Sequence, residues 1–412
     1  MKLIIKNLWL ACFICLSVLV AKAATHYLVP TNTSAANPYT NWGMAATSII
    51  DVVKAAMTNS SSLRIIWVTN GVYVLTNDAT TITNDVVIRS VNGRDATIFN
   101  GNGLYRGFRL NHTNCVLDGL TITNGYSTGG GAGILMNSGI VTNCLITDCI
   151  SDGAGISRAG GIRIYGPGAA MVANSIIRGN IEKSGDGSGG ISLNDGSTST
   201  IQNCIIERNQ AGQNHGAGIS IGYTAPLKAT IRNCLIRYNS TATNSSRYGG
   251  GIFFSSYSTN NVLVANCTIV SNYAGETGGG ICFIGSGIKS NIIFNCIISS
   301  NKGGNAGSSA TYNIADINTP GGKYACAFSC STSNANFVLD ERGNTTNDPG
   351  FINFAGENYR FNRYSPCFNS GTNQDWMNSA VDLDGQTRIR HGRVDMGAYE
   401  LFIPEGTMFR GR

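Results

Sequence analysis

Short hydrophobic runs recur along most of the chain at a fixed period of about thirty residues. A glycine cluster precedes an apolar strand in each repeat, and the first isoleucine of that strand lies at Ile134, Ile162, Ile191, Ile219, Ile252 and Ile281. A second marker, an Asn followed by Cys or Ser and an aliphatic pair, lies at Asn114, Asn143, Asn174, Asn203, Asn233, Asn266 and Asn295. Two independent markers that share one period indicate a repeat architecture.

Each repeat contains three short strands and no helical periodicity between them. In the repeat that starts at Ile252, a second strand is expected over 262–265 and a third over 267–270. Three short strands cannot form a helix-containing solenoid, and they predict a coil of parallel strands. Consecutive coils pair at about 4.8 Å, so equivalent residues of about seven repeats stack into ladders.

The Asn marker has a structural explanation. A tight bend between strands needs a residue that tolerates the left-handed region, and Asn does so best among non-glycine residues while its amide bonds to the backbone or to the next Asn. A second Asn set lies six residues further on and is expected to end the third strand in the same way; it comprises Asn180, Asn209, Asn239, Asn272 and Asn301.

Cysteines follow the same geometry. Six of the thirteen occupy the position after the ladder Asn, at Cys115, Cys144, Cys204, Cys234, Cys267 and Cys296. We predict a stack of small buried thiols there, with bridging as the alternative. Outside the ladder, Cys330 and Cys367 lie where the repeat fades, and an exported protein meets an oxidising compartment. We predict a disulfide between them, with Cys326 as the alternative partner.

The two ends of the chain differ from the repeats. Residues 45–57 place apolar positions at helical spacing, and Thr47 or Ser48 can cap this helix, which would seal the first coil. Residues 63–75 and 86–110 are expected to form strands of early, less regular coils. From Asp348 onward we expect a cap that covers the final coil.

Composition and charge narrow the class of protein. With 42% hydrophobic residues, 52 glycines and 13% charged residues, the chain is too apolar for disorder and too glycine-rich for a helical fold. Residues 1–23 combine Lys2 and Lys6, an apolar run and the small residues Ala21 and Ala23, which is typical of a signal peptide and predicts secretion. No later stretch is long enough to span a membrane.

Removal of the signal peptide takes away three lysines, so Lys and Arg fall from 29 to 26 against 23 acids and the net charge falls from +6 to +3. A nearly neutral chain has no basic stripe for a phosphate backbone, so we expect no nucleic acid partner. We expect the mature chain to be a monomer.

Several motifs resemble a known group. The segment from Ile65 to Tyr73, the Gly-Gly-Gly-Ile and Asn-Cys-x-Ile repeats and the tail motifs over 348–351, 365–371, 382–385 and 395–400 resemble bacterial right-handed β-helix proteins of the pectate-lyase-like superfamily. The repeats are also similar to those of chlamydial polymorphic outer-membrane proteins, and the tail to a choice-of-anchor type region. The resemblance implies an all-β, right-handed parallel β-helix over 24–347 with a C-terminal cap region over 348–412.

The resemblance to pectate lyases also directs attention to acid–base residues. The loops before the glycine-opened strands stack several charges in adjacent coils. As a calcium-dependent lyase, the protein would use Lys183 or Arg158 as the base, with His215 assisting and Asp152 and Asp186 as metal or charge partners. The alternative is that these are solvated loop charges.

Aromatic, amide and cationic residues along the glycine-opened strands suit sugar rings. They are Arg163, Tyr165, Asn194 and Phe253, with Tyr223 and Tyr248 nearby. Exposed strands favour aromatics in any case, so these residues also fit a plain strand surface. We therefore predict a secreted β-helix that binds or processes an extracellular polysaccharide. The alternatives are a lyase acting on a uronate polymer, for which calcium is a possible cofactor, and a non-catalytic surface or adhesive protein.

Overall fold

The computed structural model of the 412-residue chain describes residues 23–78, 81–212, 215–222, 227–242, 247–255, 261–284, 292–304, 317–318, 325–331 and 343–402. The predicted signal peptide, apart from its last residue, and Tyr223 lie outside these ranges. Within them, no helix has the length and apolar character needed to cross a membrane.

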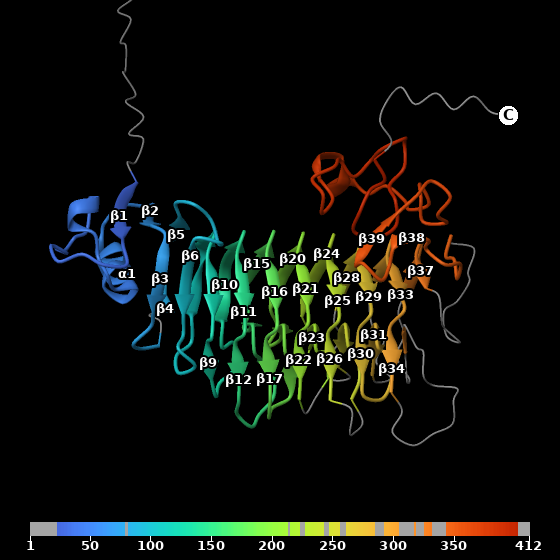
Figure 1. The fold of residues 1–412 in the computed structure, drawn as a ribbon, viewed down its shortest axis with the longest axis horizontal. Helices are drawn as coiled ribbons and strands as arrows, with labels where there is room; N and C mark the ends of the chain where they lie inside the picture. The colour runs from blue at the N-terminus through green and yellow to red at the C-terminus, as the bar shows by residue number, and fades with distance from the viewer. Residues whose placement is uncertain are drawn as a thin grey trace, which may run out of the picture.

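The repeats form a coil of parallel strands, as the sequence predicts (Figure 1). The glycine-opened position is occupied by β4 (Thr81–Ile82), the first parts of β7 (Phe108–Asp118) and β10 (Ile134–Thr142), β14 (Ile162–Ile164), β19 (Ile191–Leu193), β23 (Ile219–Ile221), β27 (Ile252–Phe254), β31 (Ile281–Phe283) and β35 (Ile317–Asn318).

The second strand position runs the length of the coil. It contains β1 (Ala24–Leu28), β2 (Arg64–Val68), β5 (Val86–Ser90), the second parts of β7 and β10, β15 (Ala169–Ala173), β20 (Thr198–Gln202), β24 (Lys228–Arg232), β28 (Asn261–Ala265), β32 (Ile292–Phe294) and β36 (Ala325–Ala327).

The third position forms a separate sheet of β3 (Gly71–Val74), β6 (Thr97–Asn100), β8 (Thr121–Thr123), β11 (Leu145–Thr147), β16 (Ile176–Arg178), β21 (Ile205–Glu207), β25 (Leu235–Arg237), β29 (Thr268–Val270), β33 (Ile297–Ser299) and β37 (Cys330–Ser331).

A short fourth position adds to the three predicted strands. Its two-residue strands are β9 (Tyr126–Ser127), β12 (Ile150–Ser151), β17 (Ile181–Glu182), β22 (Gln210–Ala211), β26 (Ser240–Thr241), β30 (Tyr273–Ala274) and β34 (Lys302–Gly303). In two coils the chain then forms β13 (Arg158–Ala159) and β18 (Gly187–Ser188), which pair with each other.

The bore of the coil is apolar because alternate residues of each strand point inward. Ile162 and Ile164 are fully buried while Arg163 between them is not. In β19, β23, β27 and β31 the middle residue is buried as well, although it lies on the outer column. The ladder cysteines are buried free thiols, as predicted. Cys204 and Cys234 each place Sγ near the backbone oxygen two residues earlier, at 3.1 and 3.2 Å.

The bend ladder confirms the Asn prediction from Asn143 to Asn295, since all six asparagines have φ between 49 and 55°. The prediction for its first member, Asn114, was wrong. Asn114 lies inside β7, and the pairing of Thr121 with Leu145 puts Gly119, with φ of 72°, at the position of Asn143. The coil from Gly119 to Asn143 is therefore shorter than the predicted period of about thirty residues, because the repeat is irregular before Gly119.

The second Asn set plays a different role from the one predicted. The residue before each Asn takes the left-handed conformation, at Gly179, Arg208, Tyr238, Ser271 and Ser300. The asparagines themselves point inward and are at most 1% exposed. They bond from coil to coil, so this set is a buried hydrogen-bond ladder rather than a row of bend residues.

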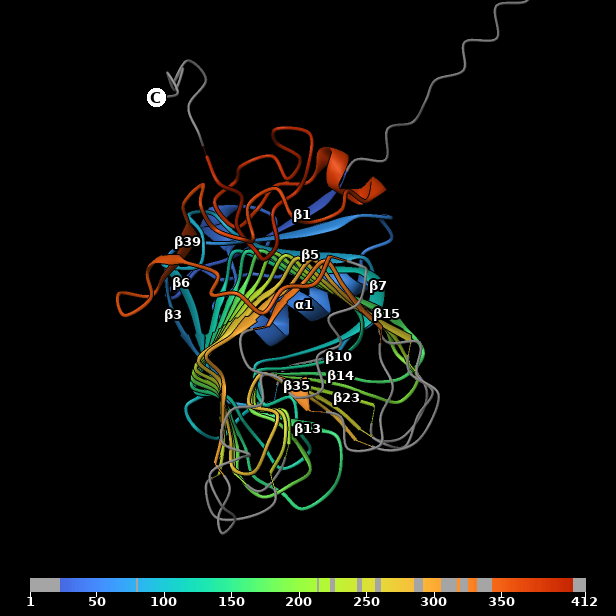
Figure 2. The same cartoon turned by 90° about the vertical axis from the view of Figure 1, so that its right-hand side faces the viewer.

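The N-terminal end is closed by α1 (Ile49–Thr58), which lies across the bore in the end-on view (Figure 2). Ser48 caps it by accepting the Asp51 N–H at 3.3 Å, as predicted. The short helix η1 (Trp42–Met44) precedes it. The buried residues Val52, Val53 and Ala56 pack against the core of the early coils.

The C-terminal segment, residues 343–402, contains β38 (Phe351–Asn353), β39 (Asn358–Phe361) and the short helix η2 (Asp375–Ser379). It lies along the side of the coil rather than over its final turn (Figures 1 and 2). The bend asparagines hold it there: Nδ2 of Asn233, Asn266 and Asn295 donates to backbone oxygens of this segment. The predicted cap therefore covers the side of the coil and not its final turn. The reason is that the side-chain amides of the bend asparagines donate hydrogen bonds to the segment along that side.

Candidate functional site: an arginine cluster on the glycine-opened strands

One outward-facing column of residues on the glycine-opened strands includes two of the predicted sugar-contact residues, Arg163 and Phe253. The pairing registers align Arg109, Leu135, Arg163, Ser192, Ser220 and Phe253 in successive coils. Inward neighbours such as Ile162 and Ile164 fix this register because they fill the core. Arg109 and Arg163 therefore lie on the same outer column, two coils apart.

Four arginines gather around this column, and we call Arg106, Arg109, Arg158 and Arg163 the arginine cluster. Burial lowers the pKa of Arg106 to about 10, and the positive charges of Arg109 and Arg163 lower it further. Burial also lowers the pKa of Arg163, and the charge of Arg158 acts in the same direction. Like charges that shift one another's pKa in this way lie within electrostatic reach.

Arg106 anchors the cluster and the glycine loop of its coil. It is 3% exposed, its Nε donates to the Gly131 oxygen at 2.9 Å and its Nη2 donates to the Gly130 oxygen at 3.1 Å and to Ser127 Oγ. Gly130 and Gly131 both have positive φ, and a Cβ on Gly130 would meet Arg158 Cα at 2.9 Å. The close approach of these two loops requires glycine.

The other arginines bind backbone oxygens but keep hydrogen-bonding capacity. Arg158 donates to the oxygens of Thr128 and Ala154, and Arg163 donates to the Gly129 oxygen at 3.0 Å. Among the residues the structure describes, the buried Nε of Arg109, Arg158 and Arg163 has no hydrogen-bond partner. Three buried N–H groups without an acceptor are costly unless something fills them.

Acidic partners only partly neutralise the cluster. Asp78 lies 3.9 Å from both Arg106 and Arg109, and Asp195 lies 3.5 Å from Arg163. Tyr165 contributes an aromatic face, with the Arg163 guanidinium 5.6 Å from its ring centroid. Four cations against these two carboxylates leave an excess of positive charge, and with the unfilled donors this describes an anion-binding surface.

The predicted acid–base residues come together only in part. Lys183 Nζ lies 3.8 Å from Asp152, whose other oxygen accepts from Ser184 Oγ at 2.6 Å. Asp186 meets Arg158 through the backbone, with the Arg158 N–H donating to the Asp186 oxygen at 3.0 Å. In the described ranges, no three His, Cys, Asp or Glu side chains converge as a metal site would require.

A buried carboxylate lies beside this loop. Glu182 is fully buried, its Oε1 accepts from the backbone N–H groups of Ser184 and Gly185, and burial raises its pKa to about 7. Because it has no exposed surface, Glu182 shapes the loop between Ser184 and Asp186 rather than meeting a ligand directly.

His215, one coil beyond β18, lies in an aromatic stack instead of an acid–base pair. Its ring stacks on Tyr248 and Phe253 at centroid distances of 4.9 and 4.5 Å. Nδ1 accepts the Tyr248 N–H at 2.9 Å, and burial lowers the pKa of His215 to about 4. The imidazole is therefore neutral at pH 7 and serves as part of an aromatic surface.

The remaining predicted contact residues differ in exposure. Arg163 and Tyr165 are partly exposed, whereas Asn194 is fully buried with Nδ2 donating to Ser192 Oγ at 2.5 Å, and Phe253 is 3% exposed. Asn194 and Phe253 therefore support the surface from beneath. Sequence reasoning missed Arg106 and Arg109, although Phe108-Arg109-Leu110 repeats the apolar–Arg–apolar pattern of Ile162-Arg163-Ile164.

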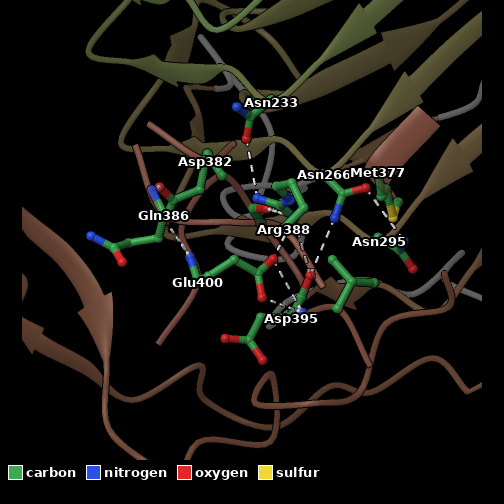
Figure 3. A network of polar contacts seen from close by, with 12 residues as sticks. Asn233, Asn266, Asn295, Met377, Asp382, Gln386, Arg388, Asp395 and Glu400 are labelled. Atoms are coloured by element: carbon green, nitrogen blue, oxygen red, sulfur yellow. Dashed lines mark hydrogen bonds and ion pairs between the residues drawn. The ribbon is translucent and has the colours of Figure 1, made fainter. Parts of the chain in front are cut away.

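A second cluster of ionisable groups, in the C-terminal segment, is closed to solvent (Figure 3). Arg388 is fully buried, its Nη2 lies 3.0 Å from Glu400, and its Nη1 donates to Asn233 Oδ1 at 3.1 Å. The carboxylates of Asp382 and Asp395 accept backbone N–H groups. The network holds the segment against the coil, and Asp382 to Gly385 form a turn in which the Gly385 N–H donates to the Asp382 oxygen at 3.1 Å.

The disulfide prediction was wrong for this structure. Cys330 and Cys367 are not bridged to each other, and Cys330 Sγ donates to the Asn347 oxygen at 3.1 Å. They are buried in one cluster with Ile297, Phe361 and Met396. The C-terminal segment buries more apolar surface against the coil than the sequence suggested, so packing and the Arg388 network hold it in place without a bridge.

Comparisons with known proteins agree with this architecture. Pectate lyase Pel9A superposes with a TM-score of 0.62 at 14% identity, over 91% of this chain and 96% of that one. Pectin methylesterases from Erwinia chrysanthemi (PemA) and Aspergillus niger are more distant, with TM-scores of 0.42 and 0.40 at 12% and 11% identity, each over 78% of this chain and 93% of theirs. At such identities the likeness to Pel9A shows the fold alone.

No curated protein matches the chain in sequence. The family model described as right handed beta helix region matches residues 50–261 and 161–338, which together span most of the chain. The chain therefore belongs to the right-handed β-helix family.

Proposed function

We propose that the protein is a secreted binder of an acidic polysaccharide, and that the arginine cluster receives the carboxylates of its uronate residues. One observation carries the proposal: Arg109 and Arg163 stay partly exposed, at 41% and 22%, on one outer column of the coil, and the four arginines of the cluster outnumber the carboxylates of Asp78 and Asp195 that pair with them. A carboxylate is the acceptor that arginine prefers, since the two planar groups match in geometry.

The shape of the surface supports a polymer rather than a small anion. Arg109 and Arg163 lie two coils apart on the column, and the partly exposed rings of His215 and Tyr248 stack further along the coil. Ser192 and Ser220, which follow Arg163 on the column, are fully buried, so the arginines and the aromatic stack are separate contact points. Consecutive coils are about 4.8 Å apart, so a chain of several sugar rings can reach both. The fold shared with pectate lyase Pel9A is consistent with a pectin-like ligand.

Binding is favoured over catalysis because the candidate bases are engaged. Arg158 holds two backbone oxygens, Lys183 is paired with Asp152, and His215 is neutral and stacked. These contacts suit residues that hold a surface in shape. A lyase remains the second candidate function, since Lys183 is half exposed beside the cluster.

The test is the affinity for polygalacturonate measured by isothermal titration calorimetry with wild type and Arg109→Gln. Arg109 is 41% exposed and pairs with Asp78, so its loss spares the core. We expect at least about a tenfold loss, or about 1.4 kcal/mol, as for a charged hydrogen bond. Lys228→Ala removes an exposed charge from β24 and should change nothing.

Two outcomes would decide against the proposal. If wild type fails to bind polygalacturonate at low ionic strength, or if Arg109→Gln and Lys228→Ala behave alike, the cluster does not receive uronates. Absorbance from an unsaturated product, followed with and without calcium, separates binding from cleavage. Product that disappears in a Lys183→Ala variant would establish the lyase function instead.

A further inference from the structure

A second candidate site lies toward the C-terminal end of the coil, where the C-terminal segment meets the last described turns. A cavity of about 500 Å³ opens between the end of β33 and the hairpin of β38 and β39. Its wall includes Ser300, Thr346, Asp348, Phe351 and Phe354. The volume is in the range of small-molecule sites, which run from about 300 to 1,000 Å³.

The aromatic wall of the cavity is rigid. Phe351 and Phe354 stack with centroids 6.1 Å apart, and Tyr359 contacts both rings edge-on at 5.4 and 5.8 Å. Tyr359 is 1% exposed and its hydroxyl donates to Tyr238 at 3.0 Å, which ties the hairpin to the coil. Phe354 is 38% exposed, so a flat apolar face stays open to a ligand at little cost in side-chain entropy.

The polar wall is also held in place. The Thr345 N–H donates to the Ser329 oxygen and the Ser331 N–H to the Thr345 oxygen, which fixes the start of this wall to the last strand of the third sheet. Asp348 Oδ1 accepts the Gly350 N–H at 2.8 Å, which orients the carboxylate. Ser300 has φ of 59°, so the chain bends at the rim beneath it.

The lining chemistry selects the ligand. Hydroxyls of Ser300 and Thr346 donate and accept hydrogen bonds, the Asp348 carboxylate accepts them, and the part of the lining that the structure describes contains no Lys, Arg or His. The described lining therefore carries a negative charge and favours a neutral ligand over an anion, in contrast to the arginine cluster. A ligand with one apolar face and several hydroxyl groups satisfies both walls, and that is a neutral pyranose ring.

We infer that this cavity is a second carbohydrate site, which takes a neutral sugar with its apolar face on Phe354 and its hydroxyls toward Ser300, Thr346 and Asp348. The site is separate from the arginine cluster and does not depend on it. The proposed acidic polysaccharide and this neutral sugar would bind beside different sheets of the same coil.

A glycan microarray carrying neutral galactan, mannan, xylan and glucan oligosaccharides together with oligogalacturonates tests the inference. We expect wild type to retain at least one neutral class. Phe354→Ala should weaken that retention on the order of tenfold, while Phe354→Tyr keeps it. Ile352→Ala is the matched control, because Ile352 is 58% exposed in the same hairpin and does not line the cavity.

The pattern of losses separates this site from the proposed function. Arg109→Gln should reduce retention of oligogalacturonates and leave the neutral class unchanged, whereas Phe354→Ala should do the reverse. Thermal melting of each variant confirms the fold. If wild type retains no neutral oligosaccharide, or if Phe354→Ala retains as much as Ile352→Ala, the cavity is not a sugar site, whatever becomes of the arginine cluster.

Discussion

Nδ2 of Asn209 donates a hydrogen bond of 2.9 Å to Oδ1 of Asn239 in the next coil, and both side chains are fully buried. The same Oδ1 accepts the backbone N–H of Asn209 at 3.1 Å, and Nδ2 of Asn239 donates to the Ile206 oxygen at 2.9 Å. Nδ2 of Asn239 also donates to Oδ1 of Asn272 at 2.9 Å. One carboxamide therefore satisfies two donors and two acceptors inside the coil, where water cannot replace it.

Replacing Asn239 by Ala should lower the free energy of unfolding by about 3 kcal/mol, because it leaves several buried polar groups without partners. Urea denaturation followed by circular dichroism measures the loss. Gln210→Ala removes an exposed amide from a neighbouring coil and should cost less than about 0.5 kcal/mol. Equal midpoints for the two variants would contradict a stabilising ladder.

The ladder cysteines should resist alkylation in the native protein. Cys144, Cys204 and Cys234 are fully buried, and burial raises the pKa of Cys144 to about 12, so thiolate is scarce at pH 8. Reaction with an aromatic disulfide reagent should release little product before unfolding and a stoichiometric amount afterward. Cys326, which is partly exposed, is expected to react first. Rapid native labelling of Cys234, identified by peptide mapping, would show that the register is wrong.

The fold was predictable because Asn recurs once per coil, and a left-handed bend between strands favours Asn. Asn143 to Asn295 recur where the chain must enter the left-handed region, and their spacing equals one coil. The same reasoning failed at Asn114, because a glycine can do the same work: Gly119 takes the bend, and an Asn-Cys pair five residues earlier imitates the motif.

The candidate site was only half predictable for a related reason. Arg158 and Arg163 lie in a regular repeat, so their positions relative to the neighbouring coils could be inferred from the spacing of the repeats. Arg106 and Arg109 lie in an early coil whose loops differ in length, and nothing in the period places them beside Arg163. The position of the C-terminal segment depended on contacts such as Arg388 with Asn233, which join residues 155 positions apart and leave no local signal.

Arg106 and Arg109 should respond differently to substitution, because one anchors a loop and the other faces outward. Arg106→Met removes donors to the oxygens of Gly130 and Gly131 and should lower the melting temperature by several degrees, with a loss of about 1 to 3 kcal/mol. Arg109→Gln should leave the melting temperature unchanged while weakening polygalacturonate binding. If Arg109→Gln melts as low as Arg106→Met, Arg109 is a structural residue rather than a contact.

Raising the pH from 6.5 to 8 should destabilise the protein, because three buried carboxyls share one arginine. Desolvation raises the pKa of Glu400 to about 9, and the nearby Asp395 raises it further, while Arg388 lowers it. In this window Glu400 is protonated in the folded state and ionised in the unfolded state, where its pKa is about 4.5. The unfolded chain thus binds fewer protons, and stability falls as the pH rises.

Other shifted groups act mainly below this window. The raised pKa of Asp395, about 6, adds a loss of the same sign at lower pH, and that of Glu182, about 7, adds one that extends into the lower part of the window. The lowered pKa of His215, about 4, has the opposite sign, since its contribution is present above 6.5 and is lost as the pH falls toward 4. Unfolded thiols, whose ordinary pKa is about 8.5, are about a quarter ionised at pH 8 and add a loss of the same sign, so the slopes of the variants are compared between pH 6.5 and 7.5.

Urea denaturation at half-unit steps measures the slope, which for one proton is at most about 1.4 kcal/mol per pH unit. Glu400→Gln resembles the protonated side chain, keeps an acceptor for the Asp395 N–H and should flatten the slope. Asp375→Asn, which removes a carboxyl from η2, serves as the control and should leave the slope in place. A wild-type stability that is constant or rises over this range, or a Glu400→Gln variant with the wild-type slope, would show that Glu400 is ionised in its ion pair with Arg388.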